Sequence, residues 1–201
     1  MPRHPVRAAT PADRPAVIRI LADAFADDPA MTWLFSDPAR RARRLPRLFT
    51  TIARVDADPA IWSLSLAGDG TPAAVAMWRA PGAWATPPLA MLGALPALVG
   101  TFGRALPRAL ALQSALEAHH PAPPHWYLQF VGCAPGQQGK GHGGSAIGAR
   151  LAECDATGLP AALETATESN VGLYQALGFR VTGTFRHRDG PLFWSMWREP
   201  A

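Results

Sequence analysis

The chain has 201 residues, which is long enough for one domain with a substantial core, and its hydrophobic fraction of 48% is ordinary for a globular protein. Its formal net charge of +4 comes from arginine, because Lys140 is the only lysine. The one dense basic run, Arg40–Arg44, carries no interleaved aromatic residues, which argues against a nucleic-acid-binding protein. We therefore expect a single domain, 1–201, with no nucleic-acid partner.

Neither the N-terminus nor the cysteines point to secretion or to a metal. Residues 1–6 contain no apolar segment of the kind found in a secretory signal, so we expect a cytoplasmic protein. Cys133 and Cys154 form no C-x-x-C motif and have no clustered histidines near them in sequence. The sequence therefore predicts no metal site and no disulfide framework.

The first third of the chain predicts one short strand and two helices. A strand at Val6–Ala9 leads to a helix that begins at Thr10, with Pro11 at its first position, and ends at Asp27-Asp28-Pro29. A second helix is expected from Pro38 to about Val55. The apolar segment Met31–Phe35 between them is expected to be a loop, and its Trp33 and Phe35 either line a substrate pocket or fill the core.

A turn at Asp56–Pro59 and a β-hairpin should follow, with strands at Ile61–Leu66 and Ala73–Trp78. Residues 81–124 then depart from the preceding pattern of strands and helices and are expected to form an insert. Its apolar part predicts helices near 89–102 and 106–119, too short and too interrupted by proline for a membrane span of roughly 20 residues. This insert is expected either to cover a substrate cleft beside Trp84 or to form a subunit contact, so the chain is a monomer or a homodimer with no membrane partner.

The next stretch, His125–Ser145, predicts a strand, a glycine-rich turn and the start of a helix. Aromatic and β-branched residues fill 125–134, and five glycines lie within 136–144. Glycine lets the backbone approach a ligand closely, and a helix N-terminus favours negative charge. The stretch therefore predicts a site for a phosphate-bearing ligand.

Three phosphate motifs compete for this turn. The P-loop pattern fails because Gly141, and not serine or threonine, follows Lys140. The dinucleotide pattern G-x-G-x-x-G is met by Gly139, Gly141 and Gly144, with Glu164 about 20 residues further on. However, only residues 165–201 follow Glu164, too few for the remaining units of such a domain. The third pattern, Q-x-x-G-x-G, is met by Gln138-Gly139-Lys140-Gly141-His142-Gly143.

After that helix the chain predicts a strand at Ala161–Ala166, reached by a crossover and so parallel to the strand at 125–134. A short helix capped by Thr167 should hold Asn170 and Tyr174 on one face, because they are four residues apart. Strands at Phe179–Phe185 and Leu192–Trp197 complete the chain.

The third phosphate motif resembles the acetyl-CoA-binding motif of the GCN5-related N-acetyltransferases (GNAT). The segment Asn170–Phe179 is similar to a second signature of that family, N-x-x-x-x-Y-x-x-x-G-F. The resemblance implies an α/β fold in which helices flank a central mixed, twisted β-sheet, with a helical insert (81–124) before the central strand and an acetyl-CoA-binding core at about 125–180. Three further segments are similar to the puromycin N-acetyltransferase-like branch: Trp126-Tyr127-Leu128, Leu163-Glu164-Thr165 and Trp194-Ser195-Met196-Trp197.

The resemblance also implies where acetyl-CoA, the only cofactor expected, would bind. The strand would bind the pantetheine arm through its backbone, the turn would bind the pyrophosphate, and Asn170 and Tyr174 would lie near the thioester. The cofactor-binding residues implied are Val131, Gly132, Cys133, Gln138, Gly139, Lys140, Gly141, His142, Gly143, Gly144, Ser145, Asn170 and Tyr174.

The expected activity is acetyl transfer to the primary amine of a small molecule by direct attack in a ternary complex. Tyr174 is the expected general acid, by resemblance, and Glu164 can accept the amine proton. Glu164 could instead be a structural carboxylate bonded to nearby backbone. Gln129 stands where some family members have an acidic residue, and glutamine cannot act as a base. Trp33, Phe35 and Trp84 are the expected substrate-binding residues. Two alternatives remain, a CoA-sensing domain without turnover and a nucleotide-dependent oxidoreductase.

Overall fold

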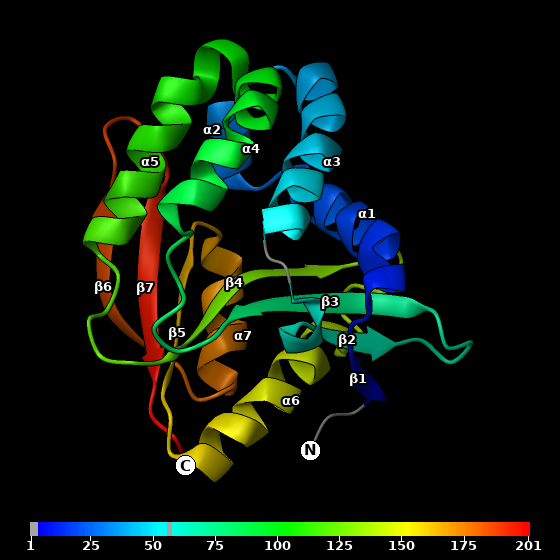
Figure 1. Cartoon of the computed structure of the whole chain (residues 1–201). Helices are drawn as coiled ribbons and strands as arrows, with labels where there is room; N and C mark the ends of the chain where they lie inside the picture. The colour runs from blue at the N-terminus through cyan, green and yellow to red at the C-terminus, as the bar shows by residue number, and fades with distance from the viewer. Residues whose placement is uncertain (1–3, 56–57) are drawn as a thin grey trace.

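The computed structural model of the chain describes residues 4–55 and 58–201, so Asp56 and Ala57 of the expected turn lie outside the described residues. One seven-stranded mixed sheet organises the molecule, with the strand order β1-β2-β3-β4-β5-β7-β6 (Figure 1). The strands are β1 (Val6–Ala8), β2 (Ser63–Leu66), β3 (Pro72–Arg79), β4 (Trp126–Cys133), β5 (Ala161–Thr165), β6 (Arg180–Arg186) and β7 (Leu192–Arg198). This architecture confirms the predicted GNAT fold class, and β4 and β5 pair in parallel as expected.

Helices cover both faces of the sheet. They are α1 (Arg14–Ala24), α2 (Pro29–Leu34), α3 (Pro38–Val55), α4 (Pro88–Phe102), α5 (Leu106–Ala118), α6 (His142–Thr157) and α7 (Val171–Ala176). One hydrophobic core lies between α1, α3 and the sheet, and a second joins α6 and α7 to the opposite face. Figure 1 shows α1 and α3 above strands β2–β4 and α6 below them.

The segment expected as a loop, Met31–Phe35, is wrong in part, because most of it belongs to helix α2. Asp28 caps this helix by accepting hydrogen bonds from the N–H groups of Ala30 and Met31, at 2.9 and 3.0 Å. Pro29 occupies the first helical position, where the N–H group that proline lacks would have no partner within the helix. The pair Asp28-Pro29 thus starts a new helix.

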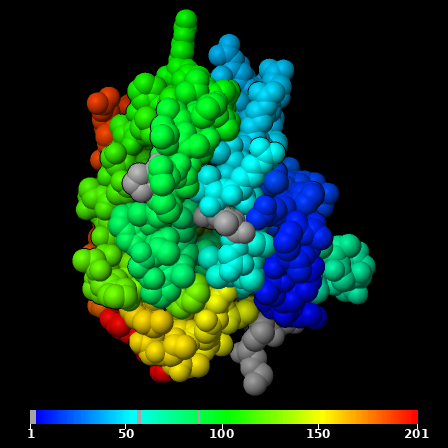
Figure 2. Space-filling model, viewed as in Figure 1, coloured from blue at the N-terminus to red at the C-terminus, as the bar shows by residue number. Residues whose placement is uncertain are grey.

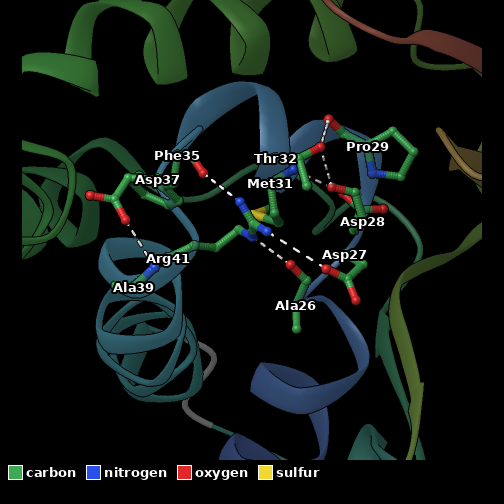
Figure 3. Close-up of polar contacts among 10 residues, drawn as sticks. All are labelled: Ala26, Asp27, Asp28, Pro29, Met31, Thr32, Phe35, Asp37, Ala39 and Arg41. Carbon is green, nitrogen blue, oxygen red and sulfur yellow. Dashed lines mark hydrogen bonds and ion pairs between the residues drawn. The ribbon is translucent and has the colours of Figure 1, made fainter.

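Arg41 of α3 fixes the connection between α1 and α2 (Figure 3). Its guanidinium donates to the carbonyl oxygens of Ala26 and Phe35, and one nitrogen lies 3.6 Å from the Asp27 carboxylate. The Arg41 side chain is buried, so these bonds replace water as its partners. They hold both ends of the segment that carries Asp28.

The insert folds into the helix pair α4 and α5, which lies above the sheet with α4 packed against α3 (Figure 1). In Figure 2 the green surface of the insert adjoins the cyan surface of α3. By length and composition alone, residues 89–118 qualify as one candidate membrane-spanning segment among the described residues. In the structure this segment is two helices, because Gly103 ends α4 with a positive φ of 51°. Several apolar side chains on the outer side of α4 are exposed: Leu89, Leu92, Leu95 and Val99.

Strands β4 and β5 separate soon after they meet. Trp126 pairs with Ala161 and Tyr127 with Ala162, and the described register between the two strands ends there. On its other edge β4 stays paired with β3 as far as Cys133, with a bulge at Gln129 where the register shifts. The last residues of β4 therefore have an open edge facing β5, and this edge is where the candidate site lies.

Candidate active site

The open edge of β4 presents backbone groups of two residues. Ala134 donates its N–H to the Ala73 carbonyl, and with the register this places Gly132 in a hydrogen-bonded pair with β3. Because residues alternate along an antiparallel ladder, the peptide groups of Val131 and Cys133 point to the opposite edge. These two residues, rather than Gly132, offer N–H groups to a ligand between β4 and β5.

Gly132 has a structural reason of its own to be glycine. A Cβ added there would lie 2.9 Å from the Cβ of Ala24 and 3.2 Å from Cδ2 of Leu21. Real side chains do not approach so closely, so Gly132 allows α1 to pack directly on β4. Its predicted place in the cofactor site is therefore explained at least in part by packing.

The glycine-rich turn delivers the chain to the N-terminus of α6. Gly139 and Gly141 have φ values of 74° and 90°, in the region that favours glycine, and Gly141 is the N-cap of the helix. Gln138 and Lys140 are exposed beside this turn. The first N–H groups of a helix lack intrahelical partners, so the turn can accept an anionic group.

The side chain of His142, an expected cofactor-binding residue, is turned inward. Its Nδ1 lies 2.9 Å from the Ser65 hydroxyl of β2, and its side chain is buried. The ring of His4 stacks on it with a centroid separation of 3.7 Å. The His142 side chain therefore anchors the turn to the sheet, and only its backbone faces the proposed phosphate position.

Two more residues of the turn pack against the protein. Gly143 lies under Cys133, and an added Cβ would be 3.2 Å from the Cys133 sulfur. Burial raises the pKa of the Cys133 thiol, which keeps it protonated near neutral pH and makes it a poor nucleophile. Ser145 is buried in the first turn of α6, where its N–H donates to the Gly141 carbonyl at 3.0 Å.

Tyr174 of α7 and Asn170, just before that helix, line one cavity next to the open edge of β4. Only 4% of Tyr174 is exposed. Burial is the main cause that raises its pKa, and the charges of Asp28 and Cys133 act in the same direction. The phenol therefore keeps its proton at neutral pH, as a proton donor must.

Glu164 is the least compensated charged group in this region. Its side chain is 2% exposed, and neither carboxylate oxygen has a hydrogen-bond partner among the described residues. Burial raises its pKa to about 7, although the nearby Tyr127 hydroxyl acts in the opposite direction without reaching hydrogen-bond geometry. The carboxylate therefore titrates near neutrality, which suits a general base.

His120 lies next to Glu164, with Nδ1 3.8 Å from the carboxylate Oε1. Burial, and then the charge of His125, lower the His120 pKa to about 4, so the ring is neutral near pH 7. The pair is therefore no salt bridge at that pH. On its other side His120 stacks on Trp84, with ring centroids 3.9 Å apart.

A cavity of about 300 Å³ joins these groups. It is lined by Val131 of the open strand edge, by Asn170 and Tyr174, and by Glu164. Trp84, an expected substrate-binding residue, also lines it. Trp33 and Phe35 instead line a separate cavity beside α3 and α5, and Phe35 packs in the core against Phe102.

Asp28 and His120 are two titratable residues of this cavity that were not predicted from the sequence. Asp28 lines it from the start of α2, and burial raises the pKa of its carboxyl group despite the capping bonds. His120 reaches it from the end of the insert. The motif Asp27-Asp28-Pro29 is a sufficient signal for the helix cap. No sequence signal, however, indicates that Asp28 or His120 lines this cavity.

The oxidoreductase alternative does not fit the topology. Among the described strands, β4 and β5 form the one parallel pair. On its other edge, β5 pairs antiparallel with β7. A dinucleotide-binding domain requires several parallel strands wound in both directions. In the part of the chain that is described, no group of three His, Cys, Asp or Glu side chains could hold a metal ion.

Known structures share this fold over the whole chain, although no family model matches it. A histone acetyltransferase HPA2 and related acetyltransferase from Corynebacterium glutamicum is 27% identical, with a TM-score of 0.75 over 98% of this chain and 97% of that one. Arylalkylamine N-acetyltransferase 2 from Aedes aegypti is 10% identical, with a TM-score of 0.66 over 99% and 100%. A GNAT superfamily phosphinothricin acetyltransferase from Sinorhizobium meliloti, solved in complex with AcCoA, is 16% identical, with a TM-score of 0.58 over 100% and 90%.

The fold and the comparisons agree with both sequence motifs. The glycine-rich turn of the first motif precedes α6 directly, and the second motif forms α7, which brings Asn170 and Tyr174 to the cavity beside the open edge of β4. The chain therefore shares the fold of known acetyltransferases, among them a member of the GNAT superfamily.

Proposed function

We propose that the protein transfers the acetyl group of acetyl-CoA directly to the primary amine of a small molecule, with Glu164 as general base and Tyr174 as general acid. One observation carries the assignment of the base. Glu164 is a buried carboxylate with no hydrogen-bond partner among the described residues and a pKa of about 7, and it lines the same cavity as Tyr174. A purely structural carboxylate would be expected to have partners for its oxygens.

The residues around the open strand edge fit acetyl-CoA. The N–H groups of Val131 and Cys133 can pair with an extended amide-containing arm as a neighbouring strand would. The turn Gln138–Ser145 ends in the N-terminus of a 16-residue helix and carries Lys140, so it suits a pyrophosphate. When bound, acetyl-CoA supplies the activated acetyl group.

Glu164 would act on the acceptor before the bond forms. A primary amine enters mostly as an ammonium ion, and the Glu164 carboxylate accepts one of its protons. The neutral nitrogen then attacks the acetyl carbonyl carbon, while a backbone N–H at the open edge of β4 stabilises the charge that develops on oxygen. Burial makes Glu164 a stronger base than an exposed glutamate, which favours this transfer.

Tyr174 would act on the leaving group. As the carbon–sulfur bond breaks, its hydroxyl donates a proton to the sulfur, and the proton released by the acetylated nitrogen returns to the phenolate through solvent. Cys133 takes no covalent part, because its thiol stays protonated. The attack is therefore direct, in a complex that holds both substrates.

A thiol-release assay with acetyl-CoA and a panel of primary amines tests the proposal. We expect amine-dependent release, a drop of about 10²-fold or more for Glu164→Gln, and no added acetyl mass on the protein after mixing with acetyl-CoA alone. Binding of acetyl-CoA without release by any amine would instead support the sensing domain. An acetylated protein intermediate would overturn direct attack.

The more specific resemblance to the puromycin N-acetyltransferase-like branch stays a prediction. Including puromycin in the amine panel tests it. Its acetylation with a kcat/KM well above that of simple amines would support the branch, and its exclusion would reject it.

A further inference from the structure

The cavity above Glu164 is a chamber whose far wall is almost entirely apolar. Helices α3, α4 and α5 provide that wall. Its lining residues are Leu48, Thr51, Ile52, Val55, Met91, Ala94, Leu98, Phe102, Leu106, Ala109, Leu110, Leu112, Gln113, Leu116 and Glu117. In Figure 1 these three helices lie together over the end of the sheet where β4 and β5 separate.

The three polar residues in this wall satisfy one another or the backbone. Gln113 donates to the Glu117 carboxylate at 2.9 Å, and Thr51 donates to the Arg47 carbonyl at 3.0 Å. Gln113 and Glu117 are both exposed to solvent, so the buried part of the wall offers an entering ligand hydrocarbon and thioether groups. A second charge on the ligand would lose its water there without compensation.

Helix α4 shows that this lining is built from one helical face. Met91, Ala94, Leu98 and Phe102 face the chamber at spacings of three and four residues, which keeps them on one side of the helix. Leu92 and Val99 lie on the other side and are 65% and 49% exposed. The same helix thus offers matched inner and outer positions for substitution.

The floor of the chamber carries the opposite chemistry. Two buried carboxyl groups, Asp28 and Glu164, line it together with Tyr174, and the charge of Asp28 acts on the Tyr174 hydroxyl. Arg79 also lines the cavity, but its guanidinium donates to the side chains of Gln129 and Thr86 at 3.2 and 3.4 Å. Arg79 keeps its positive charge, so a cationic group is favoured beside the two carboxyl groups and disfavoured at the apolar wall.

From this arrangement we infer that the acceptor is a primary amine carried on an apolar body, an alkyl or arylalkyl amine, rather than a diamine or an amino acid. The ammonium group lies at Glu164 and Asp28, and the hydrocarbon body lies between α3, α4 and α5. This inference rests on the proposed function, because it uses Glu164 as the point at which the amine reacts.

A homologous series tests the inference. Using the full-length protein, kcat/KM is measured for ethylamine, butylamine and hexylamine, and for 1,6-diaminohexane as the doubly charged match of hexylamine. Each added methylene should raise kcat/KM about three- to fourfold as it leaves water for the chamber. The diamine should fall at least tenfold below hexylamine. A flat series, or a diamine equal to hexylamine, would overturn the inference.

Paired variants locate the body of the ligand. Leu98→Gln places an amide in the chamber and should reduce the gain per methylene to twofold or less. Leu92→Gln makes the same change on the outer side of α4 and should leave the series as in the parent protein. An equal gain in kcat/KM per methylene in both variants and the parent protein would show that the ligand body lies elsewhere.

A binding measurement separates this inference from the proposed function. Thermal shift of the protein with each amine, without acetyl-CoA, reports affinity independently of turnover. Turnover of polar amines with no preference for apolar ones would overturn only the inference. Stronger stabilisation by hexylamine than by the diamine, without any turnover, would support the chamber and contradict the proposed function.

Discussion

The Ser65 hydroxyl on β2 and Nδ1 of His142 lie 2.9 Å apart, and this contact ties the sheet to the first residue of α6. Both side chains are buried, so water cannot readily replace either partner. Ser65→Ala should lower the free energy of unfolding by about 1–2 kcal/mol. A double-mutant cycle with His142→Phe should show a coupling of about 0.5 kcal/mol or more in denaturant unfolding, whereas additive effects would show that the contact contributes nothing.

The proposed phosphate-binding role of the glycine-rich turn can be tested with variants at two glycines of α6 that lie one helical turn apart. Gly144 and Gly148 both have open space where a Cβ would be built, so a side chain can start at either position without a clash. Gly144→Leu should raise the Kd for CoA at least tenfold, because its side chain enters the region of the first N–H groups. Gly148→Leu gains the same helix propensity and should leave CoA affinity unchanged. Calorimetric titration of both variants decides the matter, and equal Kd values would reject a phosphate site at this helix end.

These positions are better probes than Gly141. With a φ of 90°, Gly141 would be strained by any side chain, so Gly141→Val would disturb the backbone as well as a ligand. Loss of cofactor binding in that variant could not be assigned to steric blockage alone.

Gly132→Ala should destabilise the domain even without a ligand. The added methyl group would lie 2.9 Å from the Cβ of Ala24, and α1 must shift to accommodate it. Overpacking of this kind typically costs about 1–3 kcal/mol. Thermal unfolding of the ligand-free variant measures the loss, and Ala24→Gly in the same background should recover part of it. An unchanged Tm in Gly132→Ala would show that the helix moves freely.

Glu164→Gln should lower activity and raise stability. The folded pKa of Glu164 is about 7 against an ordinary value of 4.5, so the folded state binds more protons than the unfolded state between these pH values. Its stability therefore falls as pH rises through that range. At pH 8 the variant, which has no charge to bury, should be more stable than the parent by about 1–3 kcal/mol. At pH 4 the difference should vanish, and a variant less stable at both pH values would contradict the buried, unpartnered carboxylate.

The same pKa predicts the acidic limb of the pH–rate profile. Below pH 7 Glu164 is protonated and cannot accept the amine proton, so kcat/KM for a fixed amine should fall with an apparent pKa near 7. That limb should be absent from the residual activity of Glu164→Gln. A limb with the same apparent pKa in both proteins would assign it to another group.

Tyr174→Phe should lower kcat by roughly 10²-fold without unfolding the protein. Phenylalanine keeps the ring that packs near Phe179, at a centroid distance of 6.2 Å. Circular dichroism and acetyl-CoA binding serve as controls for folding and for the cofactor site. A kcat equal to that of the parent would remove Tyr174 from the chemistry.

Much of the fold was accessible from local sequence patterns. The hairpin that contains Leu64 and Val75 and the helical crossover between β4 and β5 each depend on residues close in sequence. Local rules therefore sufficed to predict these elements. Helix α2 was missed because its apolar residues resembled a loop between helices, and the capping by Asp28 was not recognised.

The geometry of the site depends on contacts that no local pattern encodes. The bulge at Gln129 and the early separation of β4 from β5 arise from tertiary register. His120 meets Glu164 across 44 positions of sequence, at the point where the insert returns to the sheet. Sequence alone could not show that Trp84 lines this cavity while Trp33 and Phe35 do not, because all three are aromatic residues in apolar segments.

The early separation of β4 and β5 makes the sheet incomplete along one edge. A ligand that pairs with Val131 and Cys133 would supply the missing strand, so the sheet and the ligand would protect each other's amide groups from solvent. Amide hydrogen exchange at these two residues would then report occupancy directly, before any chemistry takes place. Saturating ligand at 100 times its Kd would add about 2.7 kcal/mol to the folded state, so folding and substrate supply are thermodynamically linked through this edge.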